Sequence, residues 1–152
     1  AHHREAVDRA LREGDALGEA TALNNLAQAE QRLGHRETAA QHQLLAMEIY
    51  HRNGDERSYA VAMNNLAELY AELGLLTEAE EHARQGVELA HGGSMQFEEA
   101  FGRLVLGTVL AKRGERVAAQ AELAESLRLF VRLGSPRSML VRTALEALTT
   151  EV

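Results

Sequence analysis

Cysteine is absent from this 152-residue chain, which also has no tryptophan and a single proline. Without cysteine there are no disulfides, thiolate metal sites or cysteine nucleophiles. Aromatic residues make up only 4% of the sequence, as three Tyr and three Phe, so the residue types that favour strands are scarce. The abundant Ala, Leu, Glu and Arg favour helices, and the composition therefore predicts an all-α protein.

Long hydrophobic runs and an excess of positive charge are also missing. The longest apolar stretch, residues 104–111, is far shorter than the roughly 18 residues that a membrane span requires. Sixteen Lys and Arg against 23 Asp and Glu give a net charge of -7. A nucleic-acid partner needs a concentrated basic surface, so we expect neither a nucleic-acid nor a membrane partner, and a cytoplasmic protein.

A sequence repeat with a period of 40 residues organises the chain into three units, 20–59, 60–99 and 100–139. Residues 1–19 fit the end of a preceding unit, and residues 140–152 form a terminal helix, so we expect one repeat domain, taken from a longer protein. The units share these equivalent residues: Ala20, Ala60 and Ala100; Leu26, Leu66 and Leu106; Gly34, Gly74 and Gly114; Ala39, Ala79 and Ala119.

Apolar residues recur at helical spacing on both sides of each central glycine, which predicts a helical hairpin in every unit. Each central glycine should end its first helix in the left-handed conformation. Asp15, Asp55, Ser94 and Ser135 are predicted to cap the helices that follow the turns between units. The predicted helices are 1–13, 16–33, 36–52, 56–73, 76–91, 95–113, 116–132 and 136–149.

The second unit resembles the tetratricopeptide repeat in Met63, Leu66-Ala67, Tyr70, Gly74 and Ala79. The period of 40 and the two Asn-Asn-Leu-Ala segments are similar to the longer repeats of kinesin light chains and bacterial multidomain signalling regulators. The chain departs from the family pattern at the usual Phe position, which holds Gln43, Ala83 and Leu123, and it lacks the final Pro. The resemblance implies a right-handed superhelical solenoid of antiparallel helix pairs.

In this family the first helix of each unit lines a concave wall that holds a peptide or partner segment. Asparagine is unfavourable inside helices, and its amide can hold a peptide backbone, so Asn24 and Asn64 are candidates for such contacts. The alternative is that these residues, or Asn25 and Asn65, tie adjacent repeats together. The candidate peptide- or partner-binding residues are Thr21, Asn24, Gln28, Arg32, Val61, Asn64, Glu68, Glu72, Arg103, Leu104, Thr108 and Lys112.

Charge is spread unevenly between the units. The second has one basic and eight acidic residues, and the third has seven basic and three acidic residues. One interpretation is a bipolar groove, with Glu68 and Glu72 in one stretch and Lys112 with Arg103 in the next, which favours a ligand of matching charge order. The alternative is salt bridging between neighbouring helices and solvated outer faces.

Residues for catalysis or metal binding are not brought together by the pattern. His42 and His82, like His51 and His91, occupy equivalent positions in successive repeats, and stacked equivalents lie too far apart to share an ion. We predict no catalytic residues, metal or cofactor, and a protein-interaction scaffold that is not an enzyme. Alternatives are a regulatory or sensor segment of a larger bacterial transcription or NTPase regulator, and self-association through the terminal repeat faces.

Overall fold

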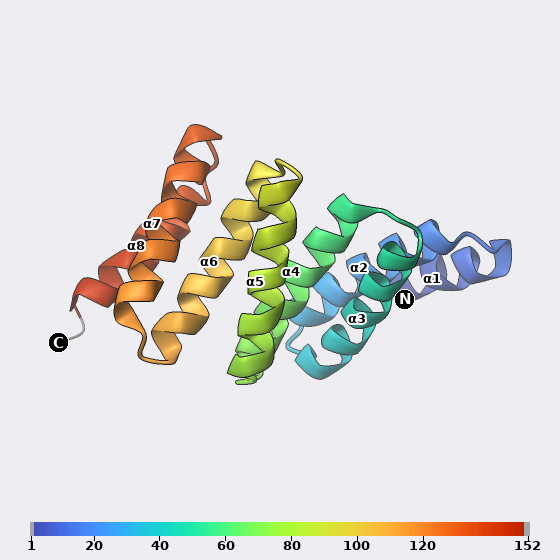
Figure 1. Ribbon diagram of the computed structural model, residues 1–152. Coiled ribbons are helices and arrows are strands. Elements are labelled where there is room, and N and C mark those ends of the chain that lie inside the picture. The colour runs from blue at the N-terminus through green and yellow to red at the C-terminus, as the bar shows by residue number, and fades with distance from the viewer. Residues whose placement is uncertain (1, 151–152) are drawn as a thin grey trace.

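The computed structural model describes residues 2–150, and within them every regular element is an α-helix. The helices pack side by side in chain order and form an all-α solenoid, with the two termini at opposite ends (Figure 1). They are α1 (His2–Glu13), α2 (Ala16–Arg32), α3 (Arg36–Arg52), α4 (Glu56–Glu72), α5 (Leu76–Gly92), α6 (Gln96–Lys112), α7 (Arg116–Arg132) and α8 (Ser138–Thr150).

The helix boundaries agree with the predicted ones to within two residues, apart from Ala1, which lies outside the described residues. The predicted left-handed glycines are confirmed, because φ is +85° at Gly34 and +82° at both Gly74 and Gly114. The largest difference is at α8, which begins at Ser138 rather than Pro136. There the Ser135 hydroxyl accepts a hydrogen bond from the backbone N–H of Arg137, ahead of the first helical turn.

Ser94 does not cap α6, so that prediction is wrong. Its φ of +57° places it at the left-handed position that Gly14, Gly54 and Gly134 hold in the other inter-repeat turns. The capping position belongs to Met95, whose side chain makes no capping hydrogen bond. The Gly92-Gly93 pair, one and two residues earlier, gave the wrong register for this turn. Asp15 and Asp55 do cap their helices, and accept bonds from the N–H groups of Gly18 and Ser58.

Small residues allow the helices to pack closely along the solenoid. Ala27, Ala67, Ala39, Ala79 and Ala119 are all fully buried. At Gly107 a Cβ would lie 2.6 Å from Leu123 Cγ, so the close packing of α6 against α7 depends on the absence of a side chain at residue 107. The leucines at the repeat-equivalent seam positions 66 and 106 are buried beside them, which gives one continuous core rather than separate hairpins.

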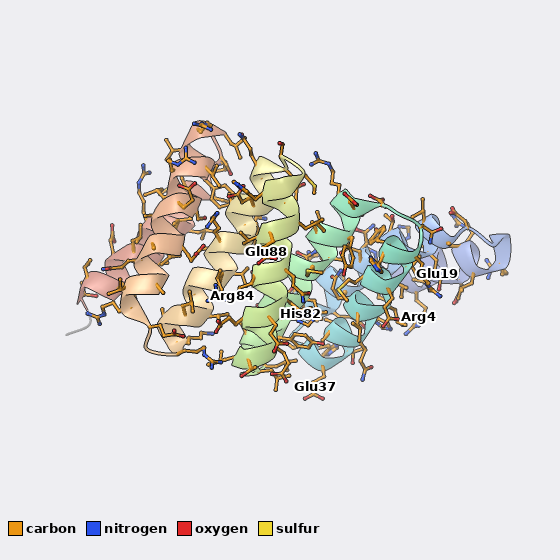
Figure 2. The ribbon with its side chains drawn as sticks, viewed as in Figure 1. Arg4, Glu19, Glu37, His82, Arg84 and Glu88 are labelled. Atoms are coloured by element: carbon orange, nitrogen blue, oxygen red, sulfur yellow. The ribbon has the colours of Figure 1, made fainter. Side chains whose placement is uncertain are left out.

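The helices divide into two sets: the A helices α2, α4, α6 and α8, and the B helices α1, α3, α5 and α7. The B helices carry exposed charged side chains, including Glu37 on α3 and Arg84 and Glu88 on α5 (Figure 2). Among the described residues, no helix has the length and apolar character that crossing a membrane requires.

Candidate functional site: the A-helix wall

The A helices line the inner side of the stack, since α4 packs directly on α6 and α6 on α8. We call this surface the A-helix wall. Side chains bridge neighbouring A helices along it, for example the Asn65 amide on α4, which donates to Asn24 Oδ1 on α2 at 3.3 Å. One cavity opens on the wall towards the N-terminal ends of α4 and α6, and another at the C-terminal ends of α6 and α8.

The first cavity, which we call the Phe97 pocket, has a volume of about 200 Å³. Phe97 lies in the first turn of α6, is 42% exposed, and packs edge-to-face on the buried Phe130 ring at 5.7 Å. The Arg137 guanidinium carbon lies 5.5 Å from the centre of the Phe97 ring and 5.2 Å from that of Phe101, within cation–π range. The lining residues are Gln28, Val61, Asn64, Asn65, Phe97, Glu98, Phe101 and Arg137.

Three wall residues, missed by the sequence analysis, are spaced by one repeat. Arg57, Phe97 and Arg137 are each 40 residues apart. Arg57 forms an ion pair with Glu98 at 3.0 Å, while Phe97 and Arg137 stack on each other. The repeat-equivalence was available in the sequence, but the family frame assigned wall positions only within the part of each unit that begins at Ala20, Ala60 or Ala100. Arg57 and Phe97 lie in the first turn of the next A helix, and Arg137 lies in the turn just before α8, so all three reach the wall.

Asn64 is completely buried, so the expectation that its amide is exposed on the wall is wrong. Its Nδ2 donates to the backbone carbonyl of Glu98 at 2.9 Å, which joins α4 to the first turn of α6. Its Oδ1 is buried and has no hydrogen-bond partner within residues 2–150. The contact supports the alternative reading, in which this asparagine ties adjacent repeats together.

Asn24, the equivalent residue in the first unit, is half-buried and makes different contacts. Its Oδ1 accepts from Gln43 Nε2 at 2.8 Å as well as from Asn65. Gln43 is fully buried at the family's usual Phe position, where the bond to Asn24 satisfies its Nε2, while its Oε1 has no hydrogen-bond partner among the described residues. The amides of the first unit thus link α2, α3 and α4.

The two acidic candidates on α4 already have partners within the chain. Gln31 donates to Glu68 at 3.1 Å and to Glu72 at 2.9 Å, and Arg36 pairs with Glu72 at 2.9 Å. Burial raises the pKa of the Glu68 carboxyl, although the hydrogen bond from Gln31 partly opposes the shift. These carboxylates therefore bridge the first and second units.

Arg103 contributes to a second internal network. Its guanidinium donates to Glu99 and to Glu122 on α7, each at 2.8 Å, and His91 also bonds Glu99 at 3.1 Å. Burial lowers the pKa of Arg103, but the hydrogen bonds that its guanidinium donates to the two glutamates outweigh this effect and raise it. Arg103 thus pairs an A helix with a B helix, which is what the salt-bridging alternative to a bipolar groove predicts.

The remaining candidates lie in varied surroundings. The Thr21 hydroxyl is hydrogen-bonded to the Tyr50 hydroxyl at 3.0 Å and lines an open depression between α1 and α2. Gln28 and Val61 line the Phe97 pocket, and Leu104 packs on the core. Arg32 is exposed, and no hydrogen bond or ion pair engages it in the described part of the chain.

The second cavity, which we call the Lys112 pocket, has a volume of about 320 Å³ and brings Thr108 and Lys112 together. The Thr108 hydroxyl donates to the Leu104 carbonyl, so it is satisfied within α6. Lys112 is exposed at the last position of α6 and is the only lysine in the sequence. The other lining residues are Ala111, Leu123, Ala144, Ala147 and Leu148.

Neither cavity offers a metal centre, because residues 2–150 contain no group of three or more His, Asp or Glu side chains arranged to hold an ion. The wall offers instead aromatic and aliphatic surface, amides and isolated cations. Such a surface suits contact with another molecule, as in the concave faces of repeat proteins.

The sequence and the fold of this chain are similar to those of known repeat proteins. The family profile described as tetratricopeptide repeat matches residues 20–53 and 60–91, which lie within the first two units. The match identifies tetratricopeptide repeats in these two segments of the chain. The crystal structure of BtubC (BKLC) from P. vanneervenii superposes with a TM-score of 0.83 and 24% sequence identity over 96% of this chain. This tetratricopeptide-repeat array spans 62% of that chain. No curated protein matches it by sequence.

Proposed function

We propose that this array is a protein-interaction scaffold that binds a peptide or partner segment along the A-helix wall. Tetratricopeptide repeats generally mediate protein–protein interaction. The observation that carries the proposal is the Phe97 pocket, where a half-exposed phenylalanine, one of three in the chain, lies beneath Arg137. Aromatic and arginine side chains are the types most enriched at the energetic centres of interfaces.

The Phe97 pocket combines apolar surface with hydrogen-bonding groups, as a peptide-binding site requires. Val61, Phe97 and Phe101 supply apolar surface for a side chain, and Gln28 and Asn65 place amides at its edge. An amide can both donate to and accept from a peptide backbone, so these two residues take the role first assigned to the buried Asn64. The side chain of Arg137 is exposed and can pair with a partner while it remains stacked on the rings.

Affinity capture with matched variants tests the proposal. Phe97→Ala removes aromatic surface from the wall, whereas Leu45→Ala removes a similarly exposed side chain, 49% against 42%, from the B helix α3. We expect Phe97→Ala and Arg137→Glu to lose the proteins that the wild type retains, and Leu45→Ala to keep them. Thermal melting of each variant shows whether it is folded. Equal retention by all folded variants would contradict binding at the wall.

Self-association is a second candidate, which exposed apolar side chains at the two ends of the array favour. Leu11 and Leu17 are exposed at the α1 end, and Met139 and Leu140 at the α8 end. Another copy that covered these faces would remove them from water. Light scattering across a range of concentrations tests this, and a mass that stays monomeric throughout would exclude it.

A regulatory segment of a larger protein would use the same wall, and the full gene sequence tests that alternative.

A further inference from the structure

The charges on the A-helix wall are not equally available to a partner. Glu68 and Glu72 accept hydrogen bonds from Gln31, and Arg36 pairs with Glu72. Glu98, beside the Phe97 pocket, is paired with Arg57. Glu72 and Glu98 are therefore ion-paired within the chain, and Glu68 is hydrogen-bonded.

Lys112 is in the opposite situation. Within residues 2–150 no hydrogen bond, ion pair or ring contact engages it, and it is exposed. As the last residue of α6 it lies where helix carbonyls favour a cation. The same is true of Arg52 at the end of α3, which is also exposed and unengaged in the described residues. Lys112 differs from Arg52 because it stands at the rim of a cavity.

That cavity is apolar and is open because its sides are alanines. Leu123 and Leu148 close the floor and are almost completely buried, at 1% and 5% exposure. Ala111, Ala144 and Ala147 line the sides, and their short side chains leave a volume of about 320 Å³. A Leu or Phe side chain placed there would bury apolar surface on three helices.

We propose that the Lys112 pocket binds a partner segment through an aliphatic or aromatic side chain with an acidic residue next to it. The apolar side chain enters between α6 and α8, and the carboxylate pairs with the Lys112 amine at the rim. Charge complementarity selects this occupant, because the wall's carboxylates are already ion-paired or hydrogen-bonded, and a basic segment would be repelled by the Lys112 amine. The inference rests on the proposed use of the wall, and it specifies the chemistry of the segment.

A library of synthetic nonapeptides with a central Leu or Phe, flanked by Asp, Lys or Gln, tests this chemistry on the full chain. We expect the Asp-flanked peptides to bind best. Lys112→Glu should weaken them about tenfold or more, as the loss of one favourable ion pair and the gain of a repulsive one requires. Arg52→Glu makes the same charge change at the end of a helix away from the wall and should leave binding unchanged. Ala147→Leu, which fills the cavity, should abolish binding, whereas Ala124→Leu on the exposed face of α7 should not.

Because the chain has a single lysine, an amine-reactive N-hydroxysuccinimide ester provides a direct readout. We expect bound Asp-flanked peptide to protect Lys112 from acylation while the N-terminal amine still reacts. Binding that favours Lys-flanked peptides, unprotected Lys112, or equal binding to Lys112→Glu and Arg52→Glu would overturn the proposal. Peptides that bind the array but respond only to Phe97→Ala would refute this pocket and leave the proposed function standing. If no peptide of the library binds the protein, the pocket is refuted. If the captured proteins are insensitive to Phe97→Ala, binding at the A-helix wall is refuted.

Discussion

The side-chain oxygen of Asn64 lies against Gly86, in the space that a Cβ on residue 86 would occupy. The same oxygen would be 2.9 Å from a Cβ on Gly102, so two glycines on neighbouring helices accommodate one amide. One repeat earlier the equivalent positions are Ala46 and Ala62, and there the equivalent Asn24 accepts hydrogen bonds from the amides of Gln43 and Asn65. The two equivalent asparagines are therefore packed differently: Asn64 is buried against glycines, and Asn24 is half-buried among other amides.

The first prediction concerns this pair. Gly86→Ala should destabilise the protein by about 1–3 kcal/mol, because the new methyl group overpacks against Asn64. In an Asn64→Ala background the clash is gone, and the same change should stabilise by up to about 1 kcal/mol, since Ala is the better helix former. Urea unfolding of the two single variants and the double variant measures this reversal of sign.

Asn64→Ala alone should lower stability by about 1–3 kcal/mol, because it removes the bond to the Glu98 carbonyl and leaves a gap. The exposed Asn25, changed to Ala, is the matched control for helix propensity. Gly86→Ala having the same effect in both backgrounds would show that Asn64 does not determine the need for glycine.

The second prediction concerns the core. Leu66 is fully buried at the repeat-equivalent seam, and Leu66→Ala should destabilise by about 2–5 kcal/mol through lost burial and a residual cavity. Leu75→Ala is a suitable control, because that leucine is 42% exposed. The free energy of unfolding in urea gives both values. Similar losses for the two variants would be inconsistent with this helix register.

The fold was accessible from the sequence because periodicity alone determines it. Glycines at one spacing mark every turn inside a unit, and apolar positions at helical spacing give the helices between them. The exception was Ser94, where a serine holds the left-handed position that glycine holds elsewhere. No local residue preference reveals such a site, because Ser is far more common as a helix cap.

The residues of the A-helix wall were harder to predict from the sequence, because the family pattern gives positions along each helix and not the directions of the side chains. Asn64 and Arg103 occupy expected wall helices but turn towards neighbouring helices, where a carbonyl and two carboxylates receive them. Which partner an amide or guanidinium finds depends on helix packing, which the repeat pattern does not contain. The Phe97 pocket also needs Arg137, which lies in the turn before α8, where the sequence predicted a helix from residue 136.

The third prediction uses the inter-repeat turn. Ser94→Gly should stabilise the protein by about 0.5–1 kcal/mol, because a left-handed backbone conformation strains a residue that has a Cβ. The reverse change, Gly54→Ser, should destabilise by a similar amount at the equivalent turn, where φ is +73°. Differential scanning calorimetry of both variants measures the two effects. A loss of stability in Ser94→Gly would mean that the serine side chain contributes more than its backbone strain removes.

The last prediction concerns the pH dependence that Glu68 imposes. Because burial raises its pKa in the folded state, the folded protein holds the Glu68 proton at pH values where the unfolded chain has released it. The unfolded chain then binds fewer protons, so the contribution of this residue to stability falls as pH rises from the ordinary value of about 4.3 to the raised one. Glu68→Gln keeps an oxygen that can accept from Gln31 and removes the titration. We therefore expect the variant and the wild type to be similar in stability at low pH, and the variant to gain relative stability as pH rises through that window and to keep it at neutral pH. Urea unfolding of both proteins across the window, with the exposed Glu88→Gln as a control of constant difference, measures the effect. A difference that moves towards the wild type as pH rises would show that the hydrogen bond from Gln31 and the attraction of Arg137 outweigh burial.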